Sequence, residues 1–153
     1  MTSRRLAPAA LLAGIAGISL PVPGMAQQLV PPGQLLSGGQ PFSCHAIPTV
    51  LHPGGHDIAW VTPGLINLNW PMFAQMPPAV QAFVYAHECA HHLHGPDENV
   101  ADCWAVQIGR DQGFIDPWAL QQICQSVWLS PGDWTHFPGP ARCANMTVCF
   151  SQP

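Results

Sequence analysis

The chain has 153 residues, of which 48% are hydrophobic and only 8% are charged, and its formal net charge is −4. It contains four arginines and no lysine. Such a chain lacks the basic surface that nucleic acids and anionic membranes require, so we exclude nucleic acid as a partner. The length fits one domain with one modest core.

Residues 1–26 are typical of a secretory signal peptide. Arg4 and Arg5 precede an apolar stretch at residues 6–20, and residues 24–26, Gly-Met-Ala, fit the small-x-small pattern of a signal-peptidase site. An uncleaved membrane anchor is the alternative, which the prolines after the apolar stretch disfavour. We expect a periplasmic or secreted chain of 127 residues (153 minus 26) with no membrane span after cleavage.

Residues 27–41 are rich in Pro, Gly and Gln. We expect them to form a flexible N-terminal segment ahead of a domain over residues 42–153. Two short strands are predicted at about residues 58–61 and 65–70, with a Pro-Gly turn between them. The second strand could hold an extended peptide by edge pairing.

Helical patterns follow the strands. The predicted helices cover residues 77–95, 97–113, 116–129 and about 140–149. Proline in the first turn opens the first helix and Gly95 stops it, while Asp97 and Asp116 are expected to cap the second and the third. A short sheet packed on three to four helices is an α+β fold.

All six cysteines lie beyond residue 43, and an even count in an exported chain predicts three disulfides. Cysteine-bound zinc is the alternative, but the chain has no C-x-x-C pair. We expect Cys89 to pair with Cys103. Cys89 lies on the helix face opposite the nearby histidines, and Cys103 lies on the neighbouring predicted helix. The pairing of the other four cysteines stays open.

The side chains that could act in catalysis or metal binding concentrate at residues 84–106. This stretch holds four of the eight histidines and both glutamates of the chain. Residues 87–91, HECAH, form an H-E-x-x-H motif inside a predicted helix. Residues four apart share a helix face, so His87 and His91 can bind one metal ion. Glu88 projects beside them, and the pattern is typical of zinc hydrolases with a glutamate general base. A solvated polar helix face is the alternative.

Zinc needs a third protein ligand and an open position for water. His94 shares the face of the motif histidines but lies about 10 Å along the helix from His87. Glu98 is the better candidate, because a Gly-Pro turn folds the chain back and places it in the first turn of the next helix. Asp102, one turn later on the same face, could accept the outer N–H of a ligand histidine.

The segments HECAH and ENVAD together resemble the H-E-x-x-H and E-x-x-A-D motifs of gluzincin metallopeptidases of the CAAX-prenyl-endopeptidase and HtpX-like type. The segment THFPGPAR, at residues 135–142, resembles a third motif of that family more loosely. Typical members are larger and membrane-embedded, with a longer interval before the third ligand. Here six residues separate His91 from Glu98. The resemblance therefore indicates a shortened, exported relative with a small zincin-like domain stapled by disulfides.

The resemblance implies Zn²⁺ as cofactor, a peptide or protein as substrate, and a role for each of several residues. The implied ligands are His87, His91 and Glu98, the base is Glu88, and Asp102 and Arg142 lie behind the ligands. His136 is the candidate to stabilise the tetrahedral oxyanion, with Tyr85 as the alternative. The predicted function is thus an exported zinc metallopeptidase. A non-catalytic zinc-binding or interaction module, or a disulfide scaffold with incidental histidines, would be the alternatives.

Overall fold

The computed structural model describes residues 26–37 and 40–153, so the expected signal peptide lies almost entirely outside the described residues. The strands are β1 (Gln28–Val30), β2 (Leu35–Ser37), β3 (Gln40–Phe42), β4 (Thr49–His52), β5 (Ala59–Thr62) and β6 (Leu65–Asn69). The helices are α1 (Trp70–Phe73), α2 (Pro78–His94), α3 (Glu98–Asp111), α4 (Pro117–Val127) and α5 (Gly139–Ser151). These short strands and helices confirm the α+β class.

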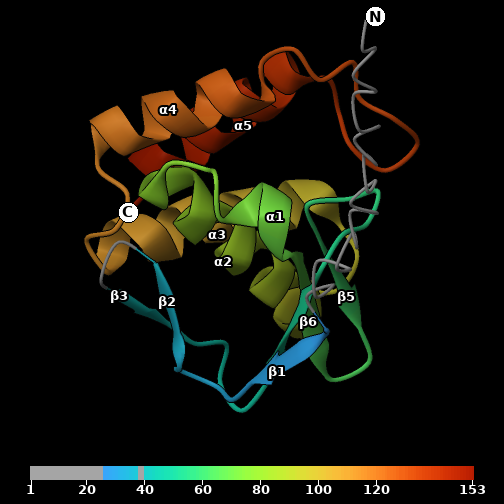
Figure 1. Ribbon diagram of the computed structural model, residues 1–153. Coiled ribbons are helices and arrows are strands. Elements are labelled where there is room, and N and C mark those ends of the chain that lie inside the picture. Colours follow the sequence, from blue (N-terminus) through green and yellow to red (C-terminus); the bar gives the residue numbers. More distant parts are fainter. Residues whose placement is uncertain (1–25, 38–39) are drawn as a thin grey trace, which may run out of the picture.

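Helix α2 lies at the centre of the molecule. In Figure 1, α4 and α5 lie on one side of α2 and α3, and the strands lie on the other side. Two faces of α2 are apolar: Val80 and Phe83 pack with residues of α3, α4 and α5, whereas Tyr85 and Cys89 pack with the sheet. Burial on both faces fixes the position of the helix that carries the H-E-x-x-H motif.

The main sheet has the strand order β1-β4-β6-β5, with β4 and β6 parallel and the other pairs antiparallel. Strand β6 lies inside the sheet, and its Ile66 and Leu68 are fully buried. The prediction that residues 65–70 could accept a peptide by edge pairing is therefore wrong, because both sides of β6 are already paired. Within the described residues, the two edge strands of this sheet are β1 and β5, and β5 pairs only with β6.

The N-terminal segment is part of the packed domain, contrary to the prediction of a flexible lead-in at residues 27–41. β1 pairs with β4, and β2 pairs with β3 in a separate small sheet. Val30 and Leu35 are buried in the core on the sheet side of α2. Three-residue strands among prolines and glycines leave no alternating pattern long enough to predict, although one apolar residue in each strand is buried, namely Val30, Leu35 and Phe42.

The helix boundaries follow the predicted caps closely. The side chain of Asp97 accepts hydrogen bonds from the backbone N–H groups of Asn99 and Val100 at the start of α3. Asp116 likewise accepts from the N–H of Ala119 at the start of α4. Gly95 ends α2 with φ of 90°, a backbone conformation that favours glycine.

Three disulfides are present, as predicted, but the expected Cys89–Cys103 pair is wrong. The pairs are Cys44–Cys89, Cys103–Cys149 and Cys124–Cys143. Cys89 faces the sheet, where it belongs to the same buried cluster as Cys44, whereas Cys103 packs on the opposite side of α2, beside Cys149 of α5. The two cysteines therefore point into different layers. Each bridge closes a long loop and contributes about 3–4 kcal/mol to stability.

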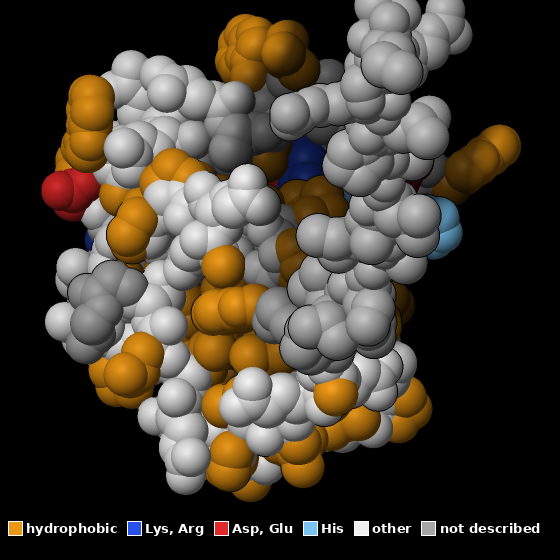
Figure 2. All heavy atoms as spheres, viewed as in Figure 1, with side chains coloured by type: hydrophobic (Ala, Val, Ile, Leu, Met, Phe, Trp, Pro, Cys, Tyr) orange, Lys and Arg blue, Asp and Glu red, His pale blue; other side chains and the backbone are white. Residues whose placement is uncertain are grey.

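The surface carries few charges. On the face shown in Figure 2, hydrophobic side chains recur and charged ones are sparse. The stretch between α4 and α5 contains four large, exposed apolar residues, namely Trp128, Leu129, Trp134 and Phe137. No helix in the described part of the chain has the length and apolar character needed to cross a bilayer.

Candidate metal centre

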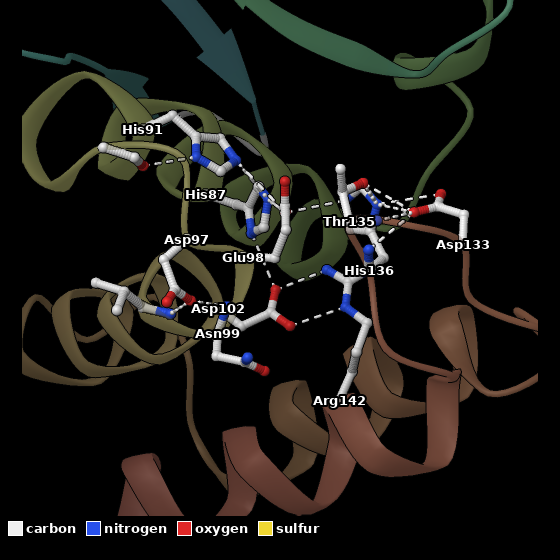
Figure 3. Close-up of polar contacts among 12 residues, drawn as sticks. His87, His91, Asp97, Glu98, Asn99, Asp102, Asp133, Thr135, His136 and Arg142 are labelled. Atoms are coloured by element: carbon white, nitrogen blue, oxygen red, sulfur yellow. Dashed lines mark hydrogen bonds and ion pairs between the residues drawn. The ribbon is translucent and has the colours of Figure 1, made fainter.

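Two helices bring the three predicted ligands together. His87 and His91 lie one turn apart near the end of α2, and Glu98 opens α3 after the reversal at Gly95. The Nε2 atoms of His87 and His91 are 3.1 Å apart. The Oε2 atom of Glu98 lies 2.9 Å from the first and 3.5 Å from the second. We refer to His87, His91 and Glu98 as the helix triad (Figure 3).

A fourth group reaches the same point from residues 128–138, the segment between α4 and α5. The Nε2 atom of His136 lies 2.9 Å from Oε2 of Glu98. His87, Glu98 and His136 each offer one ligand atom, all within 4.8 Å of one another, and could hold a metal ion. A metal site built on His87 and Glu98 could therefore take either His91 or His136 as its third ligand.

Each imidazole is oriented by a contact at its outer nitrogen. The Nδ1 atom of His87 lies 2.9 Å from Oδ1 of Asp102, and Nδ1 of His91 lies 3.0 Å from the carbonyl oxygen of Gly95. In His136 the same atom lies 3.3 Å from the carboxylate of Asp133. Outer contacts of this kind orient the rings, and all three Nε2 atoms face the centre of the cluster.

Arg142 supports the cluster through Asp102, as Figure 3 shows. Its Nε and one terminal nitrogen donate hydrogen bonds of 2.8 and 2.6 Å to the two oxygens of Asp102. Only 1% of Asp102 is exposed. Burial raises the pKa of this carboxyl, but the contacts from Arg142 and His87 outweigh burial and lower the pKa below its usual range. Asp102 therefore remains charged behind His87.

The electrostatics of the cluster favour a cation at its centre. Burial lowers the pKa of His87, yet the carboxylates of Asp102 and Glu98 raise it to about 9. Burial raises the pKa of Glu98, but the imidazoles of His87 and His91 hold it below its usual range. The buried Oε2 of Glu98 has three imidazole nitrogens within 3.5 Å but no well-directed hydrogen bond. This atom fits a metal ligand better than a hydrogen-bond acceptor.

Glu88 lies beside the cluster. It is 8% exposed, and it lines two cavities that also contact His87 and His136. Burial raises the pKa of the Glu88 carboxyl, an effect that the nearby imidazoles of His87 and His91 oppose. A buried carboxylate at the wall of a cavity, next to a cation site, is well placed to accept a proton from water.

Two other predicted candidates lie elsewhere. The hydroxyl of Tyr85 is 3.3 Å from Oγ1 of Thr49, in the core on the sheet side of α2, so the alternative role of Tyr85 as oxyanion stabiliser is wrong. His94 packs against the ring of Trp104, as expected for a residue outside the ligand set.

Sequence reasoning missed Asp133, which holds the segment that carries His136. One oxygen of Asp133 accepts hydrogen bonds of 2.8 Å from the backbone N–H groups of both Thr135 and His136. Aspartate commonly accepts from a backbone group two residues later in tight turns. The signal was therefore present in the segment D-W-T-H, but nothing in it indicates that the turn faces a metal site.

Comparison of the chain with protein families, with curated proteins and with solved structures finds no match. The function therefore has to be inferred from the site itself. The site combines imidazole and carboxylate ligand atoms with a buried carboxylate that faces a cavity.

Proposed function

We propose that this protein is an exported, zinc-dependent metallopeptidase of the gluzincin type, with His87, His91 and Glu98 as the metal ligands. The observation that carries the proposal is the convergence of the helix triad beside Glu88. Ligand atoms around one tetrahedral zinc ion lie about 3.3 Å apart. The separations within the triad are 2.9, 3.1 and 3.5 Å. Two imidazole nitrogens and one carboxylate oxygen are also a common ligand set of catalytic zinc.

The residues of the chain divide the hydrolytic work. A bound zinc ion would polarise the peptide carbonyl and lower the pKa of water to about 7. Glu88 accepts the proton of the attacking water and then delivers it to the nitrogen of the departing amine. His136, which lines the same two cavities as Glu88, donates a hydrogen bond to the carbonyl oxygen as negative charge develops there.

The edge strand β5 supports a polypeptide as the substrate. β5 borders the cleft, since Ala59 lines both cavities beside His87 and Glu88. In the described residues its outer edge is unpaired, so its backbone N–H and C=O groups can bind an extended chain as a further strand. This is the role that the sequence had suggested for residues 65–70.

Export is supported by the cysteines. All six form disulfides, a pattern typical of the periplasm and the extracellular space and rare in the cytosol. The predicted signal peptide at residues 1–26 agrees with such a compartment.

One observation favours a second candidate, a non-catalytic zinc-binding module. His136 lies as close to Glu98 as His87 does, at 2.9 Å. If His136 joined the helix triad as a fourth ligand, the site would be closed like those of structural zinc, with no position for water. Glu88 argues for the enzyme, because a closed structural site has no use for a buried carboxylate at the wall of a cavity.

The substitution Glu88→Gln separates the two candidates. It keeps the shape of the side chain but removes the carboxylate that accepts the proton. The peptidase should bind one equivalent of zinc before and after the change, while kcat/KM on a peptide library falls at least about 100-fold. His87→Ala serves as the control that loses metal and activity together. Equal cleavage by wild type and Glu88→Gln would reject Glu88 as the base, and no cleavage by the zinc-loaded wild type would favour the binding module.

A further inference from the structure

Two cavities meet over the candidate metal centre. One has a volume of about 420 Å³ and the other about 470 Å³. Their walls share Asp57, Ala59, His87, Glu88 and His136, so they form one cleft that runs across the cluster. Both volumes lie in the range of about 300–1,000 Å³ that is usual for ligand sites.

The first of these cavities has a group of apolar side chains in its wall, and we call it the apolar chamber. Its lining includes Met76, Val80, Phe83 and Val84, from the start of α2 and the turn before it, and Val127 at the end of α4. Val80 and Phe83 are almost fully buried. The chamber can therefore take a large apolar side chain of a substrate next to Glu88.

Outside the cluster, the charged side chains that line the cleft are Glu88, Asp57, Asp133 and Arg142. Arg142 lines the apolar chamber, but its guanidinium is bonded to both oxygens of Asp102. The carboxylate of Asp133 is used by the backbone of its own segment. Asp57 lines both cavities, is exposed, and forms no hydrogen bond or ion pair with any other residue that the structure describes.

We propose that the cleft selects polypeptides in which a basic side chain, bound by Asp57, is close in sequence to a large apolar side chain in the apolar chamber. The inference rests on the proposed peptidase function. Asp57 lies two residues before β5, and an extended substrate along this strand advances about 3.3 Å per residue. Asp57 is itself part of the lining of the apolar chamber, so the two selected side chains lie within about two residues of each other. An acidic side chain at the same place is repelled.

The test uses three peptides that differ at one position, with Lys, Gln or Glu placed beside a leucine, and the zinc-loaded protein. Wild type should cleave the Lys peptide with a kcat/KM about two- to fivefold above that of the Gln peptide, as an exposed ion pair allows. The Glu peptide should be the poorest substrate, and salt should weaken the order. Replacing the leucine with alanine should lower kcat/KM at least about tenfold.

Asp57→Asn should abolish the differences in kcat/KM among the Lys, Gln and Glu peptides. Asp111→Asn is the matched control, since Asp111 is also exposed but lies at the far end of α3, and it should keep the order. Zinc content and circular dichroism check that both variants fold. Cleavage of the peptides with no order in wild type, or an order that survives in Asp57→Asn, would overturn this inference and leave the peptidase function standing. Loss of the order in Asp111→Asn as well would overturn the role of Asp57. No cleavage of any peptide would overturn the proposed function and this inference with it.

Discussion

The helix triad and the segment that carries His136 reach the same point by different means. The triad lies on α2 and α3, which pack in the buried core. A disulfide joins α2 to Cys44, and another joins α3 to Cys149 of α5. Residues 128–138 have no helix or strand, and four of their large apolar side chains are exposed. The comparison shows that tertiary packing holds one half of the centre, whereas local hydrogen bonds hold the other half.

Close backbone contacts set the course of the segment that carries His136. A Cβ atom on Gly132 would lie 2.7 Å from the backbone nitrogen of Pro138, and one on Gly139 would lie 1.9 Å from the carbonyl oxygen of Val127. Gly132 also has φ of 78°. The segment is thus shaped by close contacts within itself and by the close approach of the end of α4 to the start of α5. On the proposed function, we expect the helix triad to retain the metal and His136 to act on the substrate, and three substitutions test this division.

Glu98→Ala should have the largest effect on zinc. It removes a ligand atom that is within 3.5 Å of three imidazoles, so the loss of affinity should exceed the about 10- to 100-fold typical of residues that only orient ligands. Metal analysis and competition with a chelator measure the effect. His94→Ala, on the same helix but outside the cluster, is the control and should bind zinc normally. Full zinc content in Glu98→Ala would refute the ligand set.

Arg142→Met should have an intermediate effect. The change keeps most of the apolar stem but leaves Asp102 buried without its partner, which should lower the free energy of unfolding by about 3–5 kcal/mol. Because Asp102 orients His87, zinc affinity should also fall about 10- to 100-fold. Denaturant unfolding and chelator competition give the two numbers. Arg110→Met, which removes the other arginine of the domain, should leave zinc affinity unchanged. A stable Arg142→Met variant with normal affinity would show that Asp102 does not need the guanidinium.

His136→Gln should have the smallest effect on zinc and a large effect on turnover. If His136 acts on the substrate, zinc content stays at one equivalent while kcat falls about 10²- to 10³-fold, as for the loss of an oxyanion donor. Metal analysis and steady-state kinetics on the same preparation separate the two effects, with His94→Gln as control. Loss of zinc comparable to that of Glu98→Ala would make His136 a ligand and favour the closed, non-catalytic site.

The sequence predicted the features that depend on near neighbours. Asp97 and Asp116 cap helices at the expected positions, because a cap bonds to residues two or three places away. The spacing from His87 to His91 and the turn at Gly95 bring the helix triad together within about one turn of each helix. Asp102 and Arg142 were each predicted to lie behind the ligands, and in the structure they contact each other, which the sequence did not indicate.

The features that depend on distant segments could not be predicted in the same way. The pairing of Cys89 depends on which face of α2 meets the sheet, and the parallel pair β4–β6 joins strands whose register no local pattern specifies. Asp133 shows the same limit. The turn that it forms is local, but the packing of α4 and α5 determines that this turn places His136 beside Glu98. Asp57 gave no signal at all, because its importance comes only from the cleft that surrounds it.

The scarcity of basic residues affects whether one copy of the protein could cleave another. Beyond residue 5 the chain contains no lysine and only Arg110 and Arg142. The first is bonded to the carbonyl oxygens of Phe150 and Gln152, and the second to Asp102. A peptidase that prefers basic side chains would thus find almost no accessible cleavage point on a second copy of itself. Its composition would protect it from autolysis without an inhibitor or a propeptide.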